Sequence, residues 1–412
     1  MRVLHTSDWH LGQKFQHHDR RLEHQMALDW LLETIRTKKI DVLLVAGDIF
    51  DVGNPPNYAR QMYYRFLTQV VHTTCRHVVI IAGNHDSPSM LAAPKDLLLA
   101  LNVHIVSRAN SERPEKELLE LRNQQQHLEA VIAAVPFLRD QDLRKSISGE
   151  FGLERKQAIQ AAIKVHFETV AKVAETYRTS SPDIPIIAMG HLFVKNAETP
   201  PDKRNNIYMG DTENIETNAF SSVFDYVALG HIHRPQCMDA KKRIQYSGSL
   251  IPLSFSERAD KKVVKILDFQ GRNFQICTLA VPSFRRLKKI ERQNLEEIKA
   301  RLTQLNADYA QQLPVWVEVV LTDPKFTPDL EVQLADYTKE MNLEILNVRT
   351  ASRQYDAAGE ELTLANLHDL TPLEVFERKL AQSAYQEDEE KRGLILDTFK
   401  ELQSWMKQQE TF

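Results

Sequence analysis

The sequence predicts an α/β protein of layered sheets and helices, and three observations lead to this class. Short runs rich in Val, Leu and Ile, such as Val42 to Ala46 and Val78 to Ala82, have the length of strands buried on both faces. Helical stretches separate these runs. Each run ends in a cluster of Gly, Asp, Asn or His, which is where ligands bind in open α/β sheets. Such alternation of strand, polar cluster and helix favours α/β layering.

The first half of the chain supplies most of the predicted sheet. A strand is expected at Arg2 to Thr6, and a helix with one apolar face should follow from about Asp19, a capping-type residue, to Lys38. A second helix should run from about Asn57 to Val71. Further strands are predicted at Val131 to Val135, Ile186 to Met189 and Asp225 to Leu229, with a long helix from Glu154 to Arg178.

The second half predicts another sheet and a separate module. The runs Arg243 to Tyr246, Lys262 to Phe269 and Phe274 to Leu279 resemble antiparallel strands of a second sheet. A boundary is expected at Val281-Pro282-Ser283. Strand, helix, strand, helix and strand then follow at 284–290, 295–305, 315–321, 330–341 and 343–348. We therefore expect a main domain at 1–281, a small α/β domain at 282–350, a linker at 351–371 and a helical tail at 372–412.

The tail carries an apolar stripe. Ile395, Phe399, Leu402 and Met406 share one helix face. That face either docks on a partner protein or folds back on its own domain, and the sequence leaves both alternatives open.

Composition excludes some functions and leaves others open. A chain of 412 residues with 42% hydrophobic residues and a net charge of −4 is typical of a globular protein without a general affinity for nucleic acid. Any DNA contact must come from local patches or from a metal site. No apolar run approaches the ~20 residues of a membrane span. Three cysteines, Cys75, Cys237 and Cys277, lack CxxC spacing, so we expect small core residues in a reducing cytoplasm.

Side chains that can bind a metal ion, namely Asp, Asn and His, occur at five predicted strand ends. Asp48, Asn84, His191 and His231 each directly follow a glycine, which can turn sharply and aim the next side chain. In an Asp-x-His or His-x-His pair, both side chains point the same way in extended backbone. The candidate site residues are Asp8, His10, Asp48, Asn84, His85, His191, His231 and His233.

The ligand types in this set indicate its chemistry. Imidazoles, carboxylates and one carboxamide suit borderline-to-hard divalent ions, and the absence of Cys argues against a structural zinc cage. Seven of these eight side chains, taken as ligands, exceed the need of one ion but can serve two ions that share Asp48. Two ions ~3.5–4 Å apart clamp the attacking and leaving oxygens of a phosphoryl group. The sequence therefore predicts metal-assisted hydrolysis of a phosphoester.

The motifs resemble those of a known superfamily. Asp8-x-His10, Gly47-Asp48, Gly83-Asn84-His85-Asp86, Gly190-His191 and Gly230-His231-x-His233 are similar, in order and spacing, to the calcineurin-like metallophosphoesterases. More narrowly, His5 to Gly12, Ala46 to Asp51, Gly230 to Arg234 and Tyr246 to Ser249 resemble the SbcD family of bacterial double-strand-break repair nucleases. This resemblance implies a two-sheet αββα core at 1–281, with 282–350 as a DNA-facing capping domain.

The resemblance also implies roles for the site residues. Asp8, His10, Asp48 and His233 would hold one Mn²⁺, and Asp48, Asn84, His191 and His231 would hold a second, with Mg²⁺ as the alternative ion. His85 would stabilise the transition state or protonate the leaving oxygen. Its alternative role is to orient Asp48 or Asp86 only. Asp86 would support the ligands from outside their set.

Activity and partners follow from the same resemblance. The chain would be an exonuclease on double strands and an endonuclease on single strands and hairpins, serving DNA repair, recombination and replication near the nucleoid. Its partners would be DNA, a second copy bound through helices near 57–71 and 90–101, and an SbcC-type ATPase with coiled coils in a heterotetramer. The tail at 372–412 would dock the ATPase. Arg285, Arg286, Lys288 and Lys289 would contact phosphate.

Two other functions share part of this pattern. A phosphoesterase for small molecules or phosphoproteins would use the same metal ligands, but it needs neither the 284–349 module nor the tail. A non-catalytic scaffold with this fold would be expected to have lost ligands or His85, and this chain keeps all of them.

Overall fold

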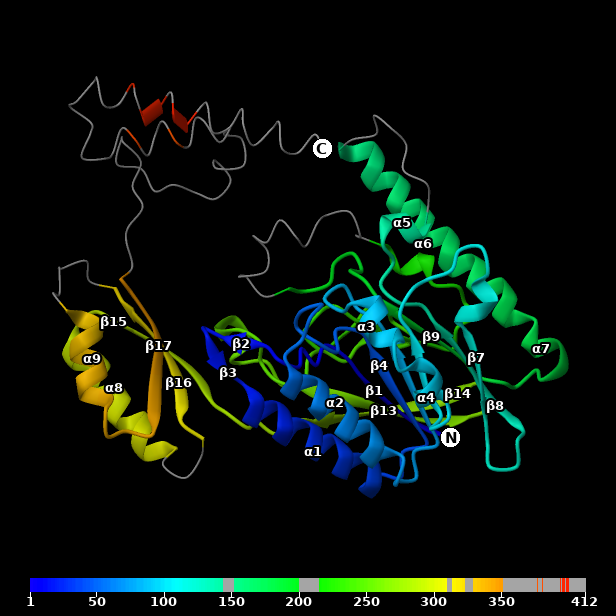
Figure 1. Ribbon diagram of the computed structural model, residues 1–412, viewed down its shortest axis with the longest axis horizontal. Helices are drawn as coiled ribbons and strands as arrows, with labels where there is room; N and C mark the ends of the chain where they lie inside the picture. Colours follow the sequence, from blue (N-terminus) through cyan, green and yellow to red (C-terminus); the bar gives the residue numbers. More distant parts are fainter. Residues whose placement is uncertain are drawn as a thin grey trace. The chain divides into compact units, whose positions relative to one another are not determined.

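Two six-stranded sheets form the main body of the protein (Figure 1). The computed structural model describes residues 1–143, 152–199, 215–309, 313–322 and 329–350, with a few positions between 376 and 399. The first sheet runs in the order β14 (Asn273–Ala280), β13 (Val263–Gln270), β1 (Arg2–Thr6), β4 (Val42–Ala46), β5 (His77–Ile81) and β6 (Val103–Val106). The second runs in the order β11 (Gln236–Cys237), β12 (Ile244–Tyr246), β10 (Tyr226–Gly230), β9 (Ile186–His191), β8 (Leu128–Ala134) and β7 (Leu118–Arg122).

The centre of each sheet is parallel. In the first sheet β1, β4, β5 and β6 pair in parallel register, and in the second β8, β9, β10 and β12 do so. Every residue of β4, β5, β9 and β10 is buried, as expected of strands covered on both faces. The carboxyl ends of these strands carry the predicted site residues.

The three later strands were expected in one second sheet, and this was wrong for two of them, although β13 and β14 do pair antiparallel as expected. β13 lies beside β1 in the first sheet, antiparallel to it, and β14 follows β13 at the edge. Only β12 joins the second sheet, and it is parallel to β10. Local sequence indicates that a run is a strand, but its partner can lie far away in the chain: Arg2 of β1 pairs with Asp268 of β13.

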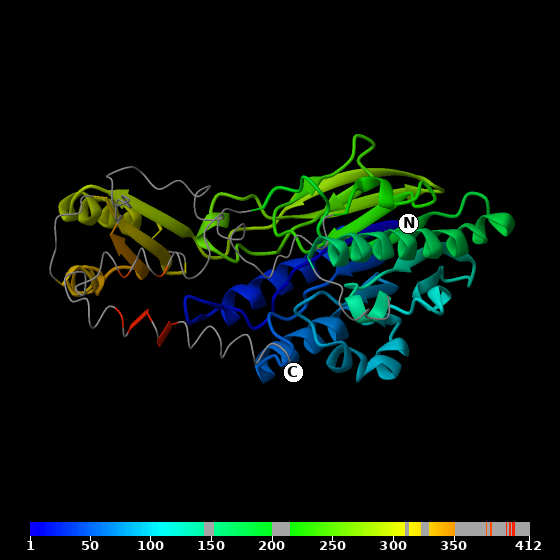
Figure 2. The ribbon, with the colours of Figure 1, turned by 90° about the horizontal axis from the view of Figure 1, so that it is seen from above.

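Helices cover the outer faces, which completes an αββα arrangement. α1 (Arg21–Thr37) and α2 (Asn57–Val70) pack their apolar sides, including Leu31 and Phe66, on the outer face of the first sheet (Figure 1). The long helix α6 (Gly152–Glu175), green in Figure 2, packs Phe167 and Val170 on the second sheet. The inner faces meet in a third apolar cluster that contains residues of both sheets, such as Leu44 and Ile187. The predicted two-sheet α/β layering is thus confirmed.

The first helices α1 and α2 have Arg20 and Pro56 at their N-cap positions, and neither side chain caps its helix. The carboxylate of Asp19 accepts a hydrogen bond from the backbone N–H of Arg21 at 2.6 Å, so this capping-type residue does satisfy a donor at the start of α1. α2 begins after Pro56, whose extended backbone ends the preceding loop.

A three-stranded sheet follows the two large ones. Its order is β15 (Leu287–Arg292), β16 (Val315–Leu321) and β17 (Leu343–Thr350), with α8 (Leu295–Asp308) and α9 (Leu330–Thr338) between the strands. This alternation of strands and helices is the predicted one. An apolar cluster joins Leu287 and Trp316 of this module to Phe15 and Phe255 of the main body.

The predicted phosphate contact of Arg285 was wrong. Its guanidinium is buried, donates to Glu23 at 2.9 Å and to the Pro314 carbonyl at 2.7 Å, and lies over the ring of Trp316. Arg285 therefore anchors the module internally. Arg286 and Lys289 are exposed.

Two of the three cysteines also differ from expectation. Cys75 is buried, whereas Cys237 and Cys277 are exposed, so only the first is a core residue. Among the described residues, no helix is long and apolar enough to cross a bilayer.

Most of the predicted tail lies outside the described residues. The structure also leaves the linker at 351–371 undescribed, and the same holds for Leu402 and Met406. Ile395 and Phe399 are helical, and Phe399 stacks on Phe376 with 3.8 Å between ring centroids.

Candidate metal centre

Five loops at the carboxyl ends of parallel strands converge on one site. β1, β4 and β5 of the first sheet lead into Asp8, Asp48 and Asn84. In the second sheet β9 ends at His191 and β10 leads into His231. The seven predicted ligands lie in overlapping groups: Asp8, His10 and His233 form one, Asp8, Asp48 and His191 form another, and Asn84 connects His191 with His231.

Asp48 lies at the centre of this set. Its Oδ2 atom is 3.2 Å from Nε2 of His191 and 3.5 Å from Nε2 of His10. One carboxylate therefore faces imidazoles from both predicted ligand groups. Asp48 and both histidines are almost completely buried, so water contributes little screening between them.

Asn84 brings in the remaining imidazole. Its Oδ1 atom is 3.1 Å from Nε2 of His191 and 3.0 Å from Nδ1 of His231. Asn84 is exposed and His231 is half-buried, whereas His191 is fully buried. This group thus lies nearer to solvent than the group around Asp8 and His10.

The tautomer of His191 shows that these atoms suit a cation. Its Nδ1 is 2.8 Å from the carbonyl oxygen of Ala46, which can only accept, so Nδ1 carries the hydrogen. In the neutral ring Nε2 is then an acceptor that faces two further acceptors, Asp48 Oδ2 and Asn84 Oδ1. His10 offers a second such atom, because its buried Nε2 has no hydrogen-bond partner among the residues that the structure describes. The residues therefore fit divalent cations bound by nitrogen and oxygen.

The electrostatics of the site favour positive charge. Burial lowers the pKa of His191, but Asp48 and Asp8 outweigh this effect and raise the pKa to about 9. Burial also disfavours the charged form of His10, yet hydrogen bonding to Asp51 and the nearby carboxylates raise its pKa. The pKa of Asp48 is well below its usual range despite burial, because His191 and His10 are close. A potential that holds protons on these imidazoles also attracts metal ions, and protons compete with metal for the same nitrogens.

Four of the predicted ligands have a left-handed backbone. The φ angles are 52° at Asp8, 47° at His10, 50° at Asp48 and 97° at His231. Such conformations cost on the order of 1–3 kcal/mol each and cluster at functional sites. The surrounding strands hold these residues in conformations that other side-chain types rarely adopt.

The glycines before the ligands serve two different purposes. Gly47 has a φ of 83° and turns the chain, as the sequence predicts. Gly83 and Gly230 instead allow close approach: a Cβ on Gly83 would lie 2.1 Å from Asp48 Oδ1, and one on Gly230 would lie 1.8 Å from the Ala46 carbonyl oxygen. Gly230 therefore lets the two sheets come together at the site.

Asp51 contacts two of the candidate site residues, a role that the sequence analysis did not assign to it. Its Oδ1 accepts from Nδ1 of His10 at 3.0 Å, and its carbonyl oxygen accepts from Nδ1 of His85 at 2.7 Å. Asp51 thereby fixes both rings, as carboxylates around metal-bound histidines commonly do. The sequence signals for it were its place at the end of the Ala46 to Asp51 motif and its position three residues after Asp48.

Asp86 supports the backbone of the site. Its carboxylate accepts from the N–H groups of Gly83, Ile49 and Phe50 at 2.8–3.2 Å. Burial and the charge of Asp48 raise its pKa to about 6. Trp9, next to Asp8, is buried against Phe66 and is a packing residue.

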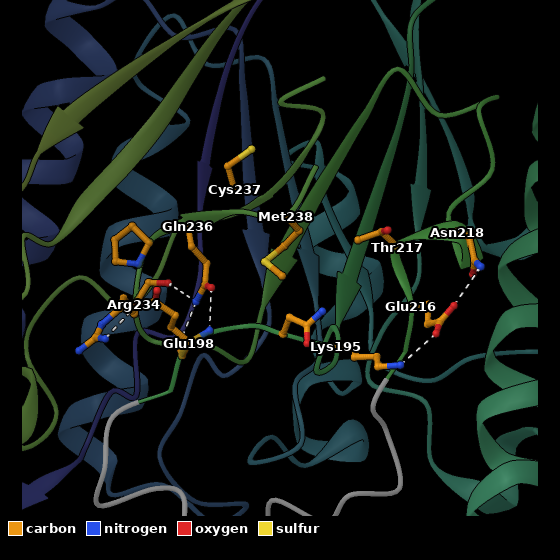
Figure 3. A pocket seen from close by; sticks show the side chains of 11 residues that line it. Lys195, Glu198, Glu216, Thr217, Asn218, Arg234, Gln236, Cys237 and Met238 are labelled. Atoms are coloured by element: carbon orange, nitrogen blue, oxygen red, sulfur yellow. Dashed lines mark hydrogen bonds and ion pairs between the residues drawn. The ribbon is translucent and has the colours of Figure 1, made fainter. Parts of the chain in front are cut away.

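A separate polar cavity of about 680 Å³ lies beside Arg234, the residue after His233. Figure 3 shows Arg234 with Glu198 at one end and Lys195 with Glu216 at the other. None of the predicted ligands lines this cavity. Because each of these cations pairs with a carboxylate, the lining has no excess charge for a phosphate.

Comparisons with known proteins agree with this geometry. Residues 1–235 match the calcineurin-like phosphoesterase family, and residues 283–384 match the family described as type 5 capsule protein repressor C-terminal domain. The D subunit of nuclease SbcCD from Escherichia coli K12 is 37% identical over 393 residues, 95% of this chain and 96% of that protein. The proteins of the same name from Rhodobacter capsulatus and Bacillus subtilis are 36% and 31% identical, over 66% and 65% of this chain and 67% and 66% of theirs.

These relatives extend the match beyond the metal centre. The Escherichia coli relative aligns with nearly the whole chain, including the three-stranded module that follows the two large sheets. The phosphoesterase family covers the segment that supplies all of the predicted ligands. The chain therefore belongs to the calcineurin-like phosphoesterases and within them to the SbcD nuclease subunits, and it is a metal-dependent phosphodiesterase.

Proposed function

We propose that this SbcD-type nuclease requires Mn²⁺ and hydrolyses DNA phosphodiesters at a two-cation site. It would act as an exonuclease on double strands and as an endonuclease on single strands and hairpins. The observation that carries the proposal is the meeting of nitrogen and oxygen acceptors around Asp48, with the exposed side chain of His85 beside them.

Asp48 would be shared between two ligand sets. Asp8, His10 and His233 would complete one set, in which two histidines and a carboxylate lie within reach of one ion. Asn84, His191 and His231 would complete the other. When bound, the cations would neutralise charge on the phosphoryl oxygens and activate water near neutral pH. Four imidazoles among seven ligands favour Mn²⁺ over Mg²⁺, which prefers oxygen.

His85 would deliver a proton to the leaving oxygen. Its Nδ1–H donates to the carbonyl oxygen of Asp51, so the opposite nitrogen, Nε2, is the atom that can exchange a proton with substrate. His85 does contact Asp48, but through its backbone N–H at 2.9 Å. Substituting the side chain leaves that contact in place, which favours the acid role over the alternative of orienting Asp48.

The proposed partners are DNA, a second copy of the chain and an SbcC-type ATPase. Each of these relatives is named as the D subunit of nuclease SbcCD, which supports a complex with a C subunit. We propose a heterotetramer in which residues 372–412 dock the ATPase, and a role in DNA repair, recombination and replication.

The test measures degradation of double-stranded, single-stranded and hairpin DNA by the purified chain, with and without Mn²⁺ and the ATPase partner with ATP. His85→Gln serves as the inactive control. We expect cleavage that requires both Mn²⁺ and His85 and that increases with the partner. Hydrolysis of small phosphodiesters with DNA untouched in every condition would contradict the proposal and direct the search to small substrates.

A further inference from the structure

A buried carboxylate that no motif includes contacts one of the proposed ligands. Glu257 ends a short 3₁₀ turn, Phe255–Glu257, and its side chain is 0% exposed. Its Oε1 accepts from Nδ1 of His233 at 3.2 Å. A charged group is costly to bury unless it is paired and hydrogen-bonded, so its presence beside a ligand requires a reason.

The other carboxylate oxygen is held from two sides. Oε2 of Glu257 accepts from the ammonium of Lys262 at 2.6 Å and from the backbone N–H of Leu253 at 3.1 Å. The 2.6 Å contact with the Lys262 ammonium identifies the group as a carboxylate. It cannot turn away from His233 without breaking contacts to two other groups.

Lys262 fixes the main chain of the same histidine. Its ammonium, which is 5% exposed, also donates to the carbonyl oxygen of His233 at 2.8 Å and to Ser249 Oγ at 2.9 Å. Glu257 thus holds the ring of His233 while Lys262 holds its backbone. Together they determine both the position and the rotation of the imidazole.

We propose that Glu257 is a positioning residue for hydrolysis, because it fixes the His233 ring so that Nε2 faces the cation site formed with Asp8 and His10. The ring of His233 lies 4.9 Å from that of His10, and a nitrogen of each lies within reach of Asp8. An accepting carboxylate also makes the opposite ring nitrogen a stronger metal ligand. The inference rests on the proposed two-cation function.

A purely structural role for Glu257 predicts a different result. Glu23 is a matched control, since it is 1% exposed and pairs with Arg20 and Arg285 but contacts no proposed ligand. If Glu257 only closes a loop, Glu257→Gln and Glu23→Gln should lower thermal stability alike and leave metal affinity unchanged. If Glu257 positions His233, only Glu257→Gln should weaken metal binding.

The experiment titrates Mn²⁺ into the metal-free full-length chain and follows free Mn²⁺ by electron paramagnetic resonance. Wild type should bind two ions. Glu257→Gln should bind one of them about 10- to 100-fold more weakly, the usual effect of removing such a partner, while Glu23→Gln matches wild type. Hydrolysis of a simple phosphodiester by Glu257→Gln should recover at saturating Mn²⁺, which separates a positioning role from a catalytic one.

The other possible results of the titration also decide whether Glu257 positions His233. Unchanged Mn²⁺ affinity in Glu257→Gln, or an equal loss in Glu23→Gln, would overturn the inference. Failure of wild type to bind two ions would instead refute the two-cation function. If Glu257→Gln does not fold, Glu257→Asp keeps the charge for Lys262 but withdraws the carboxylate from His233, and it should show the same weakening. Wild-type affinity in Glu257→Asp would overturn the inference.

Discussion

The stability of this SbcD-type nuclease should fall in mild acid because of one histidine in β1. His5 is fully buried between the two sheets, with Nε2 3.2 Å from the carbonyl oxygen of Leu229 and Nδ1 2.9 Å from the hydroxyl of Tyr226. The carbonyl can only accept, so Nε2 carries the hydrogen and Nδ1 accepts from Tyr226. A proton on Nδ1 would break this arrangement.

The surroundings of His5 lower its pKa overall. Burial lowers its pKa most, the Leu229 carbonyl partly offsets that effect, and Lys265, its cross-strand neighbour in β13, lowers it further. The resulting pKa is about 3, against 6.5 in the unfolded chain. His5 therefore stays neutral in the folded protein at every pH between these values.

The sign of the effect follows from proton binding. Between pH 6.5 and 3 the unfolded chain binds a proton at His5 and the folded chain does not, so acid favours unfolding. Stability from this residue is fully present above pH 6.5 and is lost as the pH falls toward 3. At about pH 5, which is about 1.5 units below the unfolded pKa, the loss is about 2 kcal/mol.

The assay compares urea unfolding of wild type and His5→Gln at about pH 7.5 and about pH 5 in chelator, followed by tryptophan fluorescence. Gln keeps one donor and one acceptor for Leu229 and Tyr226 but does not titrate. All other groups are common to both proteins, so wild type should lose about 2 kcal/mol more than the variant between the two conditions. Equal losses would refute the assignment of His5 as a buried neutral histidine.

Three further predictions test the metal centre. His85→Gln should retain both Mn²⁺ ions in a binding titration but lose at least about 100-fold in phosphodiester hydrolysis, a typical contribution of a general acid; loss of the ions would make His85 a ligand instead. Gly230→Ala should destabilise the fold by about 3 kcal/mol or more in denaturant, because its Cβ would overlap the Ala46 carbonyl, whereas Gly53→Ala, which meets only Ser87 at 3.7 Å, should be nearly neutral. Mn²⁺ at about 100 times its dissociation constant should stabilise the folded chain by about 2.7 kcal/mol for each ion bound, and chelator should reverse the shift in melting temperature; an unchanged melting temperature would contradict a cation site in the folded state.

The structure brings the predicted ligands together at one site, and the sequence signals for this are local. Most of the proposed ligands follow an apolar run, and the direction of a parallel strand alone brings its carboxyl end to the site. Strand bounds such as Val42–Ala46 agree with the structure for the same reason. Pairing between distant strands has no local signal, and the sheet that β13 and β14 join was therefore mispredicted.

Buried charges were the other source of error. Arg285 was expected to contact phosphate because it stands in a basic run. In the structure Arg285 and Leu287 share the buried face of their segment, while Arg286 between them is exposed. The period of two was a usable signal. Glu257 had none, since its partners His233 and Lys262 are specified only by the folded chain.

The backbone conformation of the metal centre explains why Asp and His occur at these strand ends. Asp, Asn and His are the non-glycine residues that tolerate a left-handed conformation best, and they are also good ligands for divalent ions. A tight turn at a strand end that requires positive φ therefore selects for side chains that can bind metal. Asp8, His10 and Asp48 meet both demands, and neighbouring strands hold their backbones by hydrogen bonds such as Asp8 N–H to the Gly47 carbonyl at 3.0 Å. Because contacts within the sheets hold these turns in place, ion binding need not reorganise them. The free-energy cost of the strained backbone is therefore met when the chain folds and not when the ions bind.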